Sequence, residues 1–223
     1  MDIKSVLHRC GDMLKRIFKL CFGREDAEFE RSLSLDIASW QILCSPQTQS
    51  DGTLTLFHYE NKMVKNAILA IKRRNNRQMI EIMAGIASDF LVEELSERAM
   101  MEDFSNPMIV GIPISRKNMI QKGFNHGEEI AKAIAKNILE IEFVERMLVK
   151  TRHTEPQKNL PRSQRLSNLS HSIEVAKKYV GKIKGRCIII VDDVTTTGAT
   201  LKEARRACLK AGARKILCLA VAH

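Results

Sequence analysis

The sequence predicts an α/β protein with a central, mostly parallel sheet flanked by helices. Short apolar runs alternate with segments of helical periodicity over most of the chain, which is typical of strand–helix–strand units. The late segments CIIIV (187–191) and KILCLAVA (215–222) are almost continuously apolar, as strands covered on both faces are. A turn rich in acids and threonines follows the first of them, at the position where ligands bind in open α/β sheets.

The composition favours a globular protein with anionic partners. The 223 residues suffice for one large domain or one domain with an appendage. The net charge of +10 favours nucleic acid, phosphorylated metabolites or an anionic membrane surface as partners. No apolar run approaches the ~18 residues of a membrane span, and the charged amino terminus is unlike a signal peptide. We therefore expect a cytoplasmic protein without a membrane span.

Six cysteines are scattered along the chain without any CxxC pair. Three of them lie in apolar segments, where cysteine acts as a small hydrophobic residue. We interpret them all as reduced thiols. They are Cys10, Cys21, Cys44, Cys187, Cys208 and Cys218.

The amino-terminal part is predicted to be a helical extension. Apolar residues at spacings of three and four, with basic residues around them, predict an amphipathic helix over 3–22. Such a stripe could rest on a membrane or a partner, but packing on its own domain is favoured. The polar stretch 45–52 is rich in turn residues. We therefore divide the chain into an extension with linker (1–52) and a main domain (53–223).

The sequence of the main domain predicts alternating strands and helices. The segment 151–171 is long, polar and basic, as functional loops and disordered connectors are. The expected elements are a strand at 53–60, helices at 63–74 and 79–95, a strand at 108–114, a helix at 125–139, a strand at 143–150, a weak strand at 172–176, a strand at 187–191, a helix at 200–211 and a strand at 215–222.

The stretch VDDVTTTGA (191–199) contains the candidate ligand-binding residues. We interpret it as the turn from a strand into a helix, whose first turn has free N–H groups and partial positive charge. With Gly198 allowing a tight turn and hydroxyls nearby, this forms a phosphate cradle. Asp192 and Asp193 can accept from vicinal hydroxyls or hold Mg²⁺ through water. A sugar 5-phosphate meets both demands.

Two rival interpretations of this stretch are less favoured. The acids and threonines could be only a turn and a helix cap, but capping alone does not explain so many of them in one turn. A response-regulator receiver also has paired acids that hold Mg²⁺, but there the pair follows the first strand, whereas here it lies on the penultimate strand. A P-loop is excluded because the chain has no GxxxxGK[ST] motif.

The segment IIIVDDVTTTGAT (188–200) resembles the thirteen-residue signature of the type I phosphoribosyltransferases. The resemblance implies that fold, and binding of 5-phosphoribosyl 1-pyrophosphate (PRPP) with Mg²⁺. It implies that Asp192 and Asp193 are the catalytic acids, which contact the ribose hydroxyls and assist the metal. The implied 5-phosphate loop consists of Thr195, Thr196, Thr197, Gly198, Ala199 and Thr200.

Other segments resemble the ComF family, which is linked to natural DNA uptake. These are YENKMVKNAILAIKRRNNRQM (59–79), IPISRKNMIQKGFNHGEEIAKAIA (112–135) and TRHTEPQKNLPRSQRLSN (151–168). The likeness covers roughly 55–223, with departures at Ser115, Lys122 and His126. Members usually begin with a CxxC-based zinc module. Here His8, Cys10, Cys21 and Cys44 lack that spacing, so no zinc site is expected.

The positions of two further segments suggest roles in the same site. The turn after the strand at 108 is the expected pyrophosphate loop, with a solvated basic turn as the plain alternative; it comprises Pro113, Ile114, Ser115, Arg116 and Lys117. The segment 151–171 is a candidate flexible loop that covers the ligand, or a disordered connector; its basic residues are Arg152, Lys158, Arg162 and Arg165.

Three residues outside these segments receive structural interpretations. Asn125 is predicted to cap a helix. His126 is interpreted as a surface or helix-start histidine rather than a catalytic base. Lys72 heads a basic cluster with Arg73, Arg74 and Arg77, which compensates a helix dipole or contacts a nucleic-acid backbone.

The leading functional prediction is a ComF-like phosphoribosyltransferase, a pentosyl transferase acting on an unidentified acceptor. No segment follows the last strand, so no hood over a nucleobase is expected. The second reading is a non-catalytic, PRPP-responsive protein that handles single-stranded DNA with the competence or DNA-processing machinery. The third is a purine or pyrimidine salvage enzyme. A homo-oligomer is compatible with all three.

Overall fold

A six-stranded sheet forms the centre of the protein. The computed structural model describes residues 29, 30, 32–151 and 171–223. The strand order is β1-β2-β8-β7-β3-β4. β1 pairs antiparallel with β2, and every other neighbouring pair is parallel. The strands are β1 (Gln47–Thr48), β2 (Thr53–Phe57), β3 (Met108–Gly111), β4 (Glu142–Phe143), β7 (Cys187–Val194) and β8 (Lys215–Ala222). The predicted fold class, a mostly parallel sheet with helices on its faces, is confirmed.

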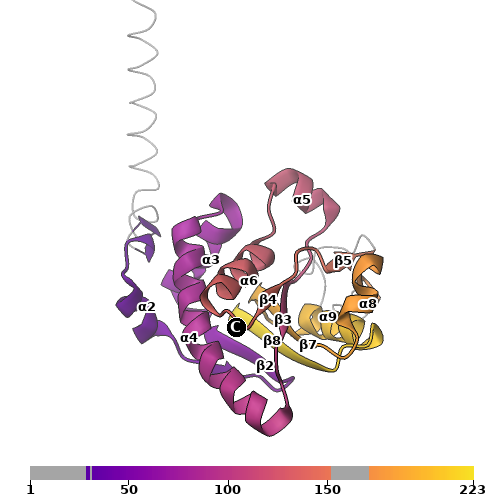
Figure 1. The fold of residues 1–223 in the computed structure, drawn as a ribbon. Helices are drawn as coiled ribbons and strands as arrows, with labels where there is room; N and C mark the ends of the chain where they lie inside the picture. The colour runs from indigo at the N-terminus through magenta and orange to yellow at the C-terminus, as the bar shows by residue number, and fades with distance from the viewer. Residues whose placement is uncertain (1–28, 31, 152–170) are drawn as a thin grey trace, which may run out of the picture.

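Helices cover both faces of this sheet (Figure 1). One face carries α2, α3, α4 and α6, and the other carries α8 and α9. The helices are α2 (Ile37–Leu43), α3 (Lys62–Arg74), α4 (Arg77–Glu102), α5 (Arg116–Lys122), α6 (His126–Asn137), the short 3₁₀ turn η2 (Lys177–Tyr179), α8 (Val180–Ile183) and α9 (Ala199–Lys210).

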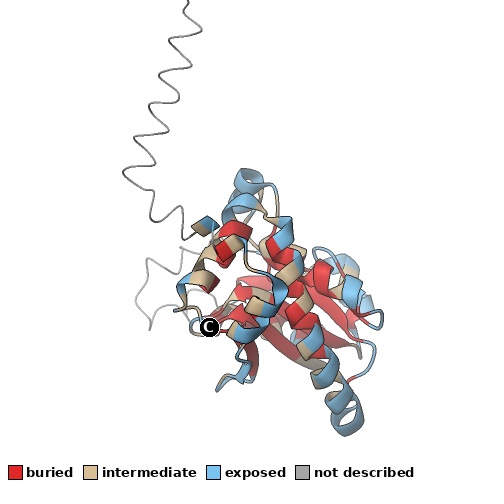
Figure 2. Ribbon diagram, turned by 90° about the vertical axis from the view of Figure 1, so that its left-hand side faces the viewer, coloured by how far each residue is buried: buried red, intermediate tan, exposed pale blue. Residues whose placement is uncertain are grey.

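Alternate residues of the central strands fill two separate cores. In β7, Ile189 and Val191 face the core under α3, α4 and α6, whereas Ile188 and Ile190 face the core under α9. This follows from the two-residue period of a strand. Figure 2 shows the consequence, since the sheet is buried and the helices packed on it are exposed mainly on their outer sides. The continuously apolar character of CIIIV thus reflects burial on both faces.

The predicted strand at 143–150 is wrong as a single element. The structure has two short strands there, β4 and β5 (Leu148–Lys150), which belong to different sheets. Arg146 between them has a φ of 53°, so the chain turns and cannot continue the first strand. β5 instead pairs antiparallel with β6 (Ile173–Val175), which is the predicted weak strand. This β5–β6 ribbon lies against α9 and brings Lys150 to the carboxyl edge of the main sheet.

Part of the predicted extension packs with the main domain. α2 begins after Asp36, whose side chain accepts from the N–H of Ser39 at 2.8 Å, as an N-cap does. Trp40 of α2 is fully buried and meets Phe57 of β2 edge to face, with ring centroids 6.1 Å apart. Residues 47–48 also add β1 to the sheet. The amphipathic helix predicted for 3–22 lies outside the described residues.

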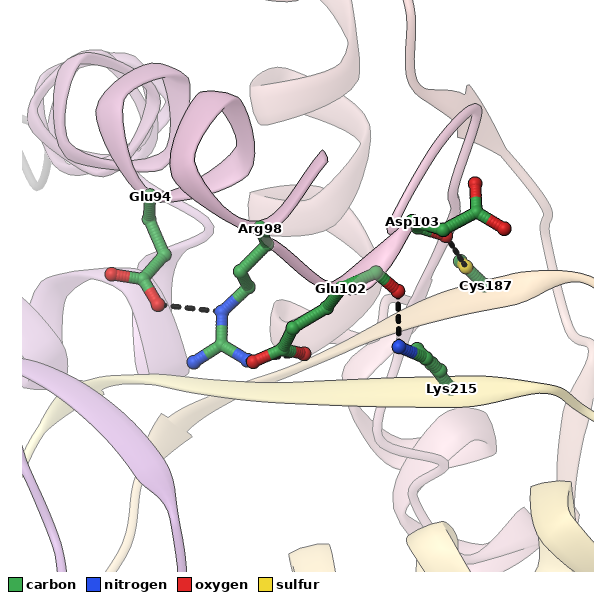
Figure 3. Close-up of polar contacts among 6 residues, drawn as sticks. All are labelled: Glu94, Arg98, Glu102, Asp103, Cys187 and Lys215. Carbon is green, nitrogen blue, oxygen red and sulfur yellow. Dashed lines mark hydrogen bonds and ion pairs between the residues drawn. The ribbon is translucent and has the colours of Figure 1, made fainter. Parts of the chain in front are cut away.

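The amino edge of the sheet is fastened by polar contacts at the end of α4 (Figure 3). Arg98 pairs with Glu94 at 2.6 Å, while Lys215 donates to the carbonyl of Glu102. Asp103 ends the helix in a left-handed conformation with a φ of 52° and pairs with Arg214. The helix end is thereby attached to the start of β8.

A cavity of about 370 Å³ lies at the same amino edge. Its lining includes Val92, Phe104, Pro107 and Ile141. Pro107 precedes β3, whereas the predicted pyrophosphate loop follows it. The cavity is therefore at the opposite edge from the predicted ligand site, and no predicted site residue lines it. Within the described ranges, no helix combines the length and hydropathy of a membrane span.

Candidate active site

The two acids of the signature end a strand and do not lie in a turn. β7 continues to Val194, with Asp192 opposite Ala220 and Val194 opposite Ala222 of β8. The prediction that the strand stops at 191 is therefore wrong. Because neighbouring residues of a strand point to opposite faces, Asp193 extends the row of Ile189 and Val191. Asp192 extends the row that faces α9 and the β5–β6 ribbon.

Asp193 is buried between the side-chain nitrogens of Lys72 and His126. It is 3% exposed, and its Oδ1 lies 2.8 Å from Nζ of Lys72. Its Oδ2 lies 2.7 Å from Nε2 of His126. Burial acts to raise the pKa of Asp193, but His126 and Lys72 outweigh it and hold that pKa below its usual range. The same ion pair raises the pKa of Lys72 against the opposing effect of burial.

Asp192 has different surroundings. It is half-buried, and its Oδ1 accepts from the backbone N–H of Asp193 at 2.9 Å. Burial, with the neighbouring charge of Asp193, raises the pKa of Asp192 to about 7. Lys150, at the end of β5, is in electrostatic range of Asp192, although burial lowers the pKa of Lys150 overall. The two acids thus differ in exposure and in hydrogen-bond partner, although Lys72 and His126 act against the raised pKa of Asp192 as well.

The threonine-rich loop runs from the end of β7 into α9. Thr195 is buried and donates its N–H to the carbonyl of Ala222 at 3.0 Å, which holds the loop to β8. Gly198 has a φ of 68°, a conformation that glycine adopts without strain. α9 begins at Ala199, whose N–H contacts Oγ1 of Thr197 at 3.4 Å. The predicted loop is thus placed at a helix amino terminus.

Gly198 also has a steric reason to be glycine. A Cβ at this position would lie less than 3.0 Å from Oδ2 of Asp51 in the turn between β1 and β2. Oδ1 of the same carboxylate accepts from the N–H of Thr53 at 3.0 Å. The turn 49–52, which the sequence indicated only as a linker, therefore touches the candidate phosphate loop.

The predicted pyrophosphate loop lies at the same edge of the sheet. β3 and β7 are adjacent and parallel, and the N–H of Ile112 donates to the carbonyl of Val191 at 2.9 Å. Beyond it, Ser115 caps α5, a short helix that the sequence analysis missed. Arg116 and Lys117 form its first turn and are exposed. The structure brings this segment and the acids to one edge of the sheet.

The start of α6 packs closely on the ends of β3 and β7. A Cβ at Gly111 would lie less than 3.0 Å from the backbone of Gly127 and Glu128. A Cβ at Gly127 would meet the carbonyl of Val191 at 3.2 Å. Two glycines thus let helix and strands approach at backbone distance. This approach places His126, the first residue of α6, beside Asp193.

Asn125 fixes this junction and confirms the predicted N-cap. Its Oδ1 accepts from the N–H of Gly127 at 3.1 Å, and its Nδ2 donates to the carbonyl of Ile112 at 2.9 Å. Asn125 is only 4% exposed. One side chain therefore joins the helix start to the first residue after β3.

Replacing Asn125 by alanine is expected to lower the free energy of unfolding by about 2–4 kcal/mol. The variant loses a helix cap and leaves the buried carbonyl of Ile112 unpaired. Ser115→Ala is the matched control, because Ser115 caps α5 in an exposed setting with one bond of 3.2 Å, and should cost about 0.5–1 kcal/mol. Urea unfolding measures both values, and equal values would show that the bond to Ile112 contributes nothing.

The predicted flexible-loop residues Arg152, Lys158, Arg162 and Arg165 lie outside the described residues. The described residues on either side meet at the ribbon, where the N–H of Thr151 donates to the carbonyl of Ser172 at 3.0 Å. Both ends of the segment are therefore attached beside Lys150. His8, Cys10 and Cys21 are also outside the described residues, so the prediction of no zinc site stays a prediction.

The sequence analysis did not place two lysines and a histidine beside the acids, namely Lys72, Lys150 and His126. A signal existed for Lys72, because it lies four residues after buried Ile68 and so continues the apolar face of α3. A signal also existed for His126, because Gly127 beside it indicates a close helix–strand approach. Nothing in the local sequence marks Lys150.

Comparison with known proteins agrees with this geometry. The sequence model of the phosphoribosyl transferase domain matches residues 79–223. This is more than half of the chain, so the chain belongs to the phosphoribosyl transferase domain family. The prediction from the signature at 188–200 is confirmed at this level.

Among curated proteins, the chain is similar to proteins whose names refer to DNA utilization and to competence. It is 26% identical over 136 residues to DNA utilization protein YhgH of Escherichia coli K12, covering 61% of this chain and 58% of that protein. It is 26% identical over 108 residues to Competence protein F of Haemophilus influenzae, covering 48% and 46%. These relatives confirm the resemblance to the ComF family. The matched region spans less than two thirds of their length.

A solved structure titled "Analysis of an invariant aspartic acid in HPRTs", in its glutamic acid mutant, is also similar. The TM-score is 0.40, with 10% sequence identity over 65% of this chain and 67% of that chain.

Proposed function

We propose that this protein binds PRPP with Mg²⁺ at the carboxyl edge of its sheet and transfers phosphoribose to an acceptor that is still unidentified. One observation supports this most strongly. A strand-end acid pair is followed directly by a left-handed glycine and a helix start, in a chain of the phosphoribosyl transferase domain family. The 5-phosphate would bind the N–H groups and hydroxyls of residues 195–200, since a helix amino terminus binds anions.

In the proposed reaction, a nitrogen of the acceptor forms a bond to C1 of the ribose while the bond from C1 to the pyrophosphate oxygen breaks. Pyrophosphate departs with the electron pair, and the acceptor nitrogen loses a proton. The protein's part is positioning and charge compensation. Arg116 and Lys117 face solvent at the same edge and are the candidate donors to the leaving group.

Asp192 is a suitable ligand for Mg²⁺. It is a half-buried carboxylate whose pKa is raised to about 7 by burial and by Asp193, so a nearby cation would stabilise its ionised form. Carboxylate oxygens, alone or through water, are what Mg²⁺ prefers together with substrate phosphates. When bound, the ion would neutralise charge on the leaving pyrophosphate.

Isothermal titration calorimetry with PRPP and Mg²⁺ tests the proposal. We expect binding to the wild-type chain and at least a ~100-fold loss in the double variant Asp192→Asn/Asp193→Asn, because charge-assisted bonds to both acids disappear. A pyrophosphate-release assay over nucleobases and amines then identifies the acceptor class. Absence of PRPP binding, or unchanged binding by the double variant, would contradict the proposed site.

A second candidate function is supported by an exposed basic segment and by the relatives' names. Lys178 and Lys182 lie 4.7 and 6.0 Å from the centre of the Tyr179 ring. Exposed lysines around an aromatic ring are typical of surfaces for single-stranded nucleic acid. PRPP binding without pyrophosphate release, together with salt-dependent retention of single-stranded DNA, would favour this second hypothesis, a non-catalytic PRPP-responsive protein. Release of pyrophosphate with a free nucleobase as acceptor would favour a purine or pyrimidine salvage enzyme.

A further inference from the structure

The cavity at the amino edge of the sheet has no part in the proposed reaction. Its volume is about 370 Å³. One wall is a single face of α4, because its residues recur at spacings of three and four; they are Val92, Leu95, Ser96 and Ala99. The rest of the lining comes from the loop before β3 and the segment after α6; its apolar members are Phe104, Pro107, Ile138 and Ile141. The cavity is therefore suited to apolar side chains.

Large apolar side chains are also exposed around this cavity. Val92, which lines it, is 50% exposed, and Leu139, next to the lining residue Ile138, is 92% exposed. Met100 and Met101, near the end of α4, are 83% and 79% exposed. The last turns of α4 project beyond the sheet (Figure 1) and are exposed (Figure 2). Apolar groups gathered around a hollow of the surface indicate a binding site for another protein segment.

The surroundings of the cavity are acidic, although the whole chain has a net charge of +10. Residues 89–103 contain six acids and one base, Arg98, which pairs with two acids of its own helix. Glu140 lines the cavity, and Asp89 and Glu93 lie on the turn of α4 at which the cavity begins. All three are exposed. A segment with basic side chains beside its apolar ones would complement this acidic rim.

The amino-terminal segment of the chain has this chemistry. Residues 3–22 contain five basic residues and one acid, Asp12, and their sequence predicts an amphipathic helix. The apolar stripe of that helix has the same three- and four-residue spacing as the wall of the cavity; it includes Val6, Cys10, Leu14, Ile17 and Cys21. An amphipathic helix binds an apolar groove through such a stripe.

The attachment point of this segment favours the cavity of a second copy over that of the same chain. The described residues begin at Phe29, whose ring lies 4.8 Å from the guanidinium of Arg74. Arg74 follows Lys72, which contacts Asp193 at the carboxyl edge. From there α4, with 26 residues, spans about 39 Å to the amino edge. Residues 23–28 extend over at most about 20 Å, so the segment of the same chain would reach the cavity only with its first turns.

We propose that the chain forms a dimer in which the cavity at the amino edge of each copy receives the segment 3–22 of the other copy. The apolar stripe of the segment fills the cavity, and its basic side chains face Asp89, Glu93 and Glu140. Because each copy donates one segment and accepts one, the exchange closes at two copies. This inference concerns the association of the chain and does not depend on the proposed function.

Charge reversal on either side of the contact tests the dimer in the full chain, without PRPP. Sedimentation velocity over about 1–100 µM, the range of moderate affinities, should show the wild-type chain passing from monomer to dimer. Glu93→Lys/Glu140→Lys reverses the charge of the rim, and Lys15→Glu/Arg16→Glu reverses the charge of the segment. Each double variant should weaken self-association at least ~10-fold.

A matched control and a mixture complete the test. Glu60→Lys/Glu174→Lys replaces two exposed acids away from the cavity and should leave self-association unchanged. In a mixture of the two charge-reversed variants, the reversed segment meets the reversed rim, and the native segment meets the native rim. The mixture should therefore regain the dimer to within ~3-fold of the wild-type affinity. Such recovery also excludes unfolding as the cause of the losses.

A wild-type chain that stays monomeric would overturn the proposal, and so would a mixture without recovery. Hydrogen exchange and vesicle binding then identify the true occupant. Slow exchange at 92–99 in a monomer, lost in Glu93→Lys/Glu140→Lys, would show docking within one chain. Binding of a monomer to vesicles of anionic phospholipid, lost in Lys15→Glu/Arg16→Glu, would show that the segment binds a membrane surface instead.

Discussion

Replacing Gly111 by alanine is expected to lower the free energy of unfolding by about 4 kcal/mol or more, a large part of the stability of a typical domain. The added Cβ would lie less than 3.0 Å from N and Cα of Glu128 and from the carbonyl carbon of Gly127. These are backbone atoms in the first turn of α6, so no side-chain rotation relieves the overlap. The helix must move away from β3, and His126 must move away from Asp193.

Urea unfolding of three glycine variants tests this explanation. Gly85→Ala in the middle of α4 meets only Ile37 Cδ1 at 3.7 Å and should stabilise by about 0.5–1 kcal/mol, because alanine is the better helix former. Gly123→Ala has open space but a φ of 77°, so it should cost about 1–2 kcal/mol. A Gly111→Ala cost no larger than that of Gly123→Ala would contradict the close backbone approach.

The fold class could be predicted because its evidence is local. An unbroken apolar run such as CIIIV indicates a strand buried on both faces. The helices at 62–74 and 77–102 are separated by Asn75, with a φ of 47°, and Asn76, which caps the second helix, as asparagine often does. Local periodicity does not reveal which strands pair. The break of the expected strand 143–150 into β4 and β5 depends on partners distant in the sequence.

The candidate site could be predicted only in part, for a physical reason. The acids were interpreted as turn residues because they lie between the apolar run CIIIV and the helical pattern that follows. In the structure Asp193 stays in β7, where Lys72 supplies an opposing charge 2.8 Å away and the His126 ring lies 2.7 Å from the other oxygen. Those partners are 121 and 67 residues away in sequence (193 − 72 and 193 − 126). Contacts between residues so distant in the sequence depend on how the helices pack. The residues around the signature therefore do not indicate them.

Residues 32–52 show the same limit for the domain boundary. The sequence analysis assigned them to the extension with linker (1–52), because 45–52 is polar and rich in turn residues. Yet the segment supplies Trp40 to the main core and β1 to the sheet. A single aromatic residue in a short helix gives too weak a periodic signal to mark a buried face.

Replacing Trp40 by alanine is therefore expected to lower the free energy of unfolding of the whole domain by about 3–5 kcal/mol. Trp40 is fully buried, and its ring meets Phe57 at an interplanar angle of 90°. Removing it leaves a cavity under α4 that the surrounding helices fill only in part. One cooperative urea transition with a lower midpoint should report this loss.

Two variants show whether the effect comes from this packing. Ile42→Ala changes a residue of the same helix that is 84% exposed, and its cost should stay within about 0.5 kcal/mol. Trp40→Phe keeps an aromatic ring and removes the indole N–H, which has no hydrogen-bond partner among the described residues, so it should cost less than Trp40→Ala. Similar costs for Trp40→Ala and Ile42→Ala would mean that α2 unfolds apart from the domain. The large difference we expect would instead make the segment before β2 part of the unit that supports the acids, because Trp40 packs on Phe57, whose partner Ala222 also pairs with Val194 at the end of β7.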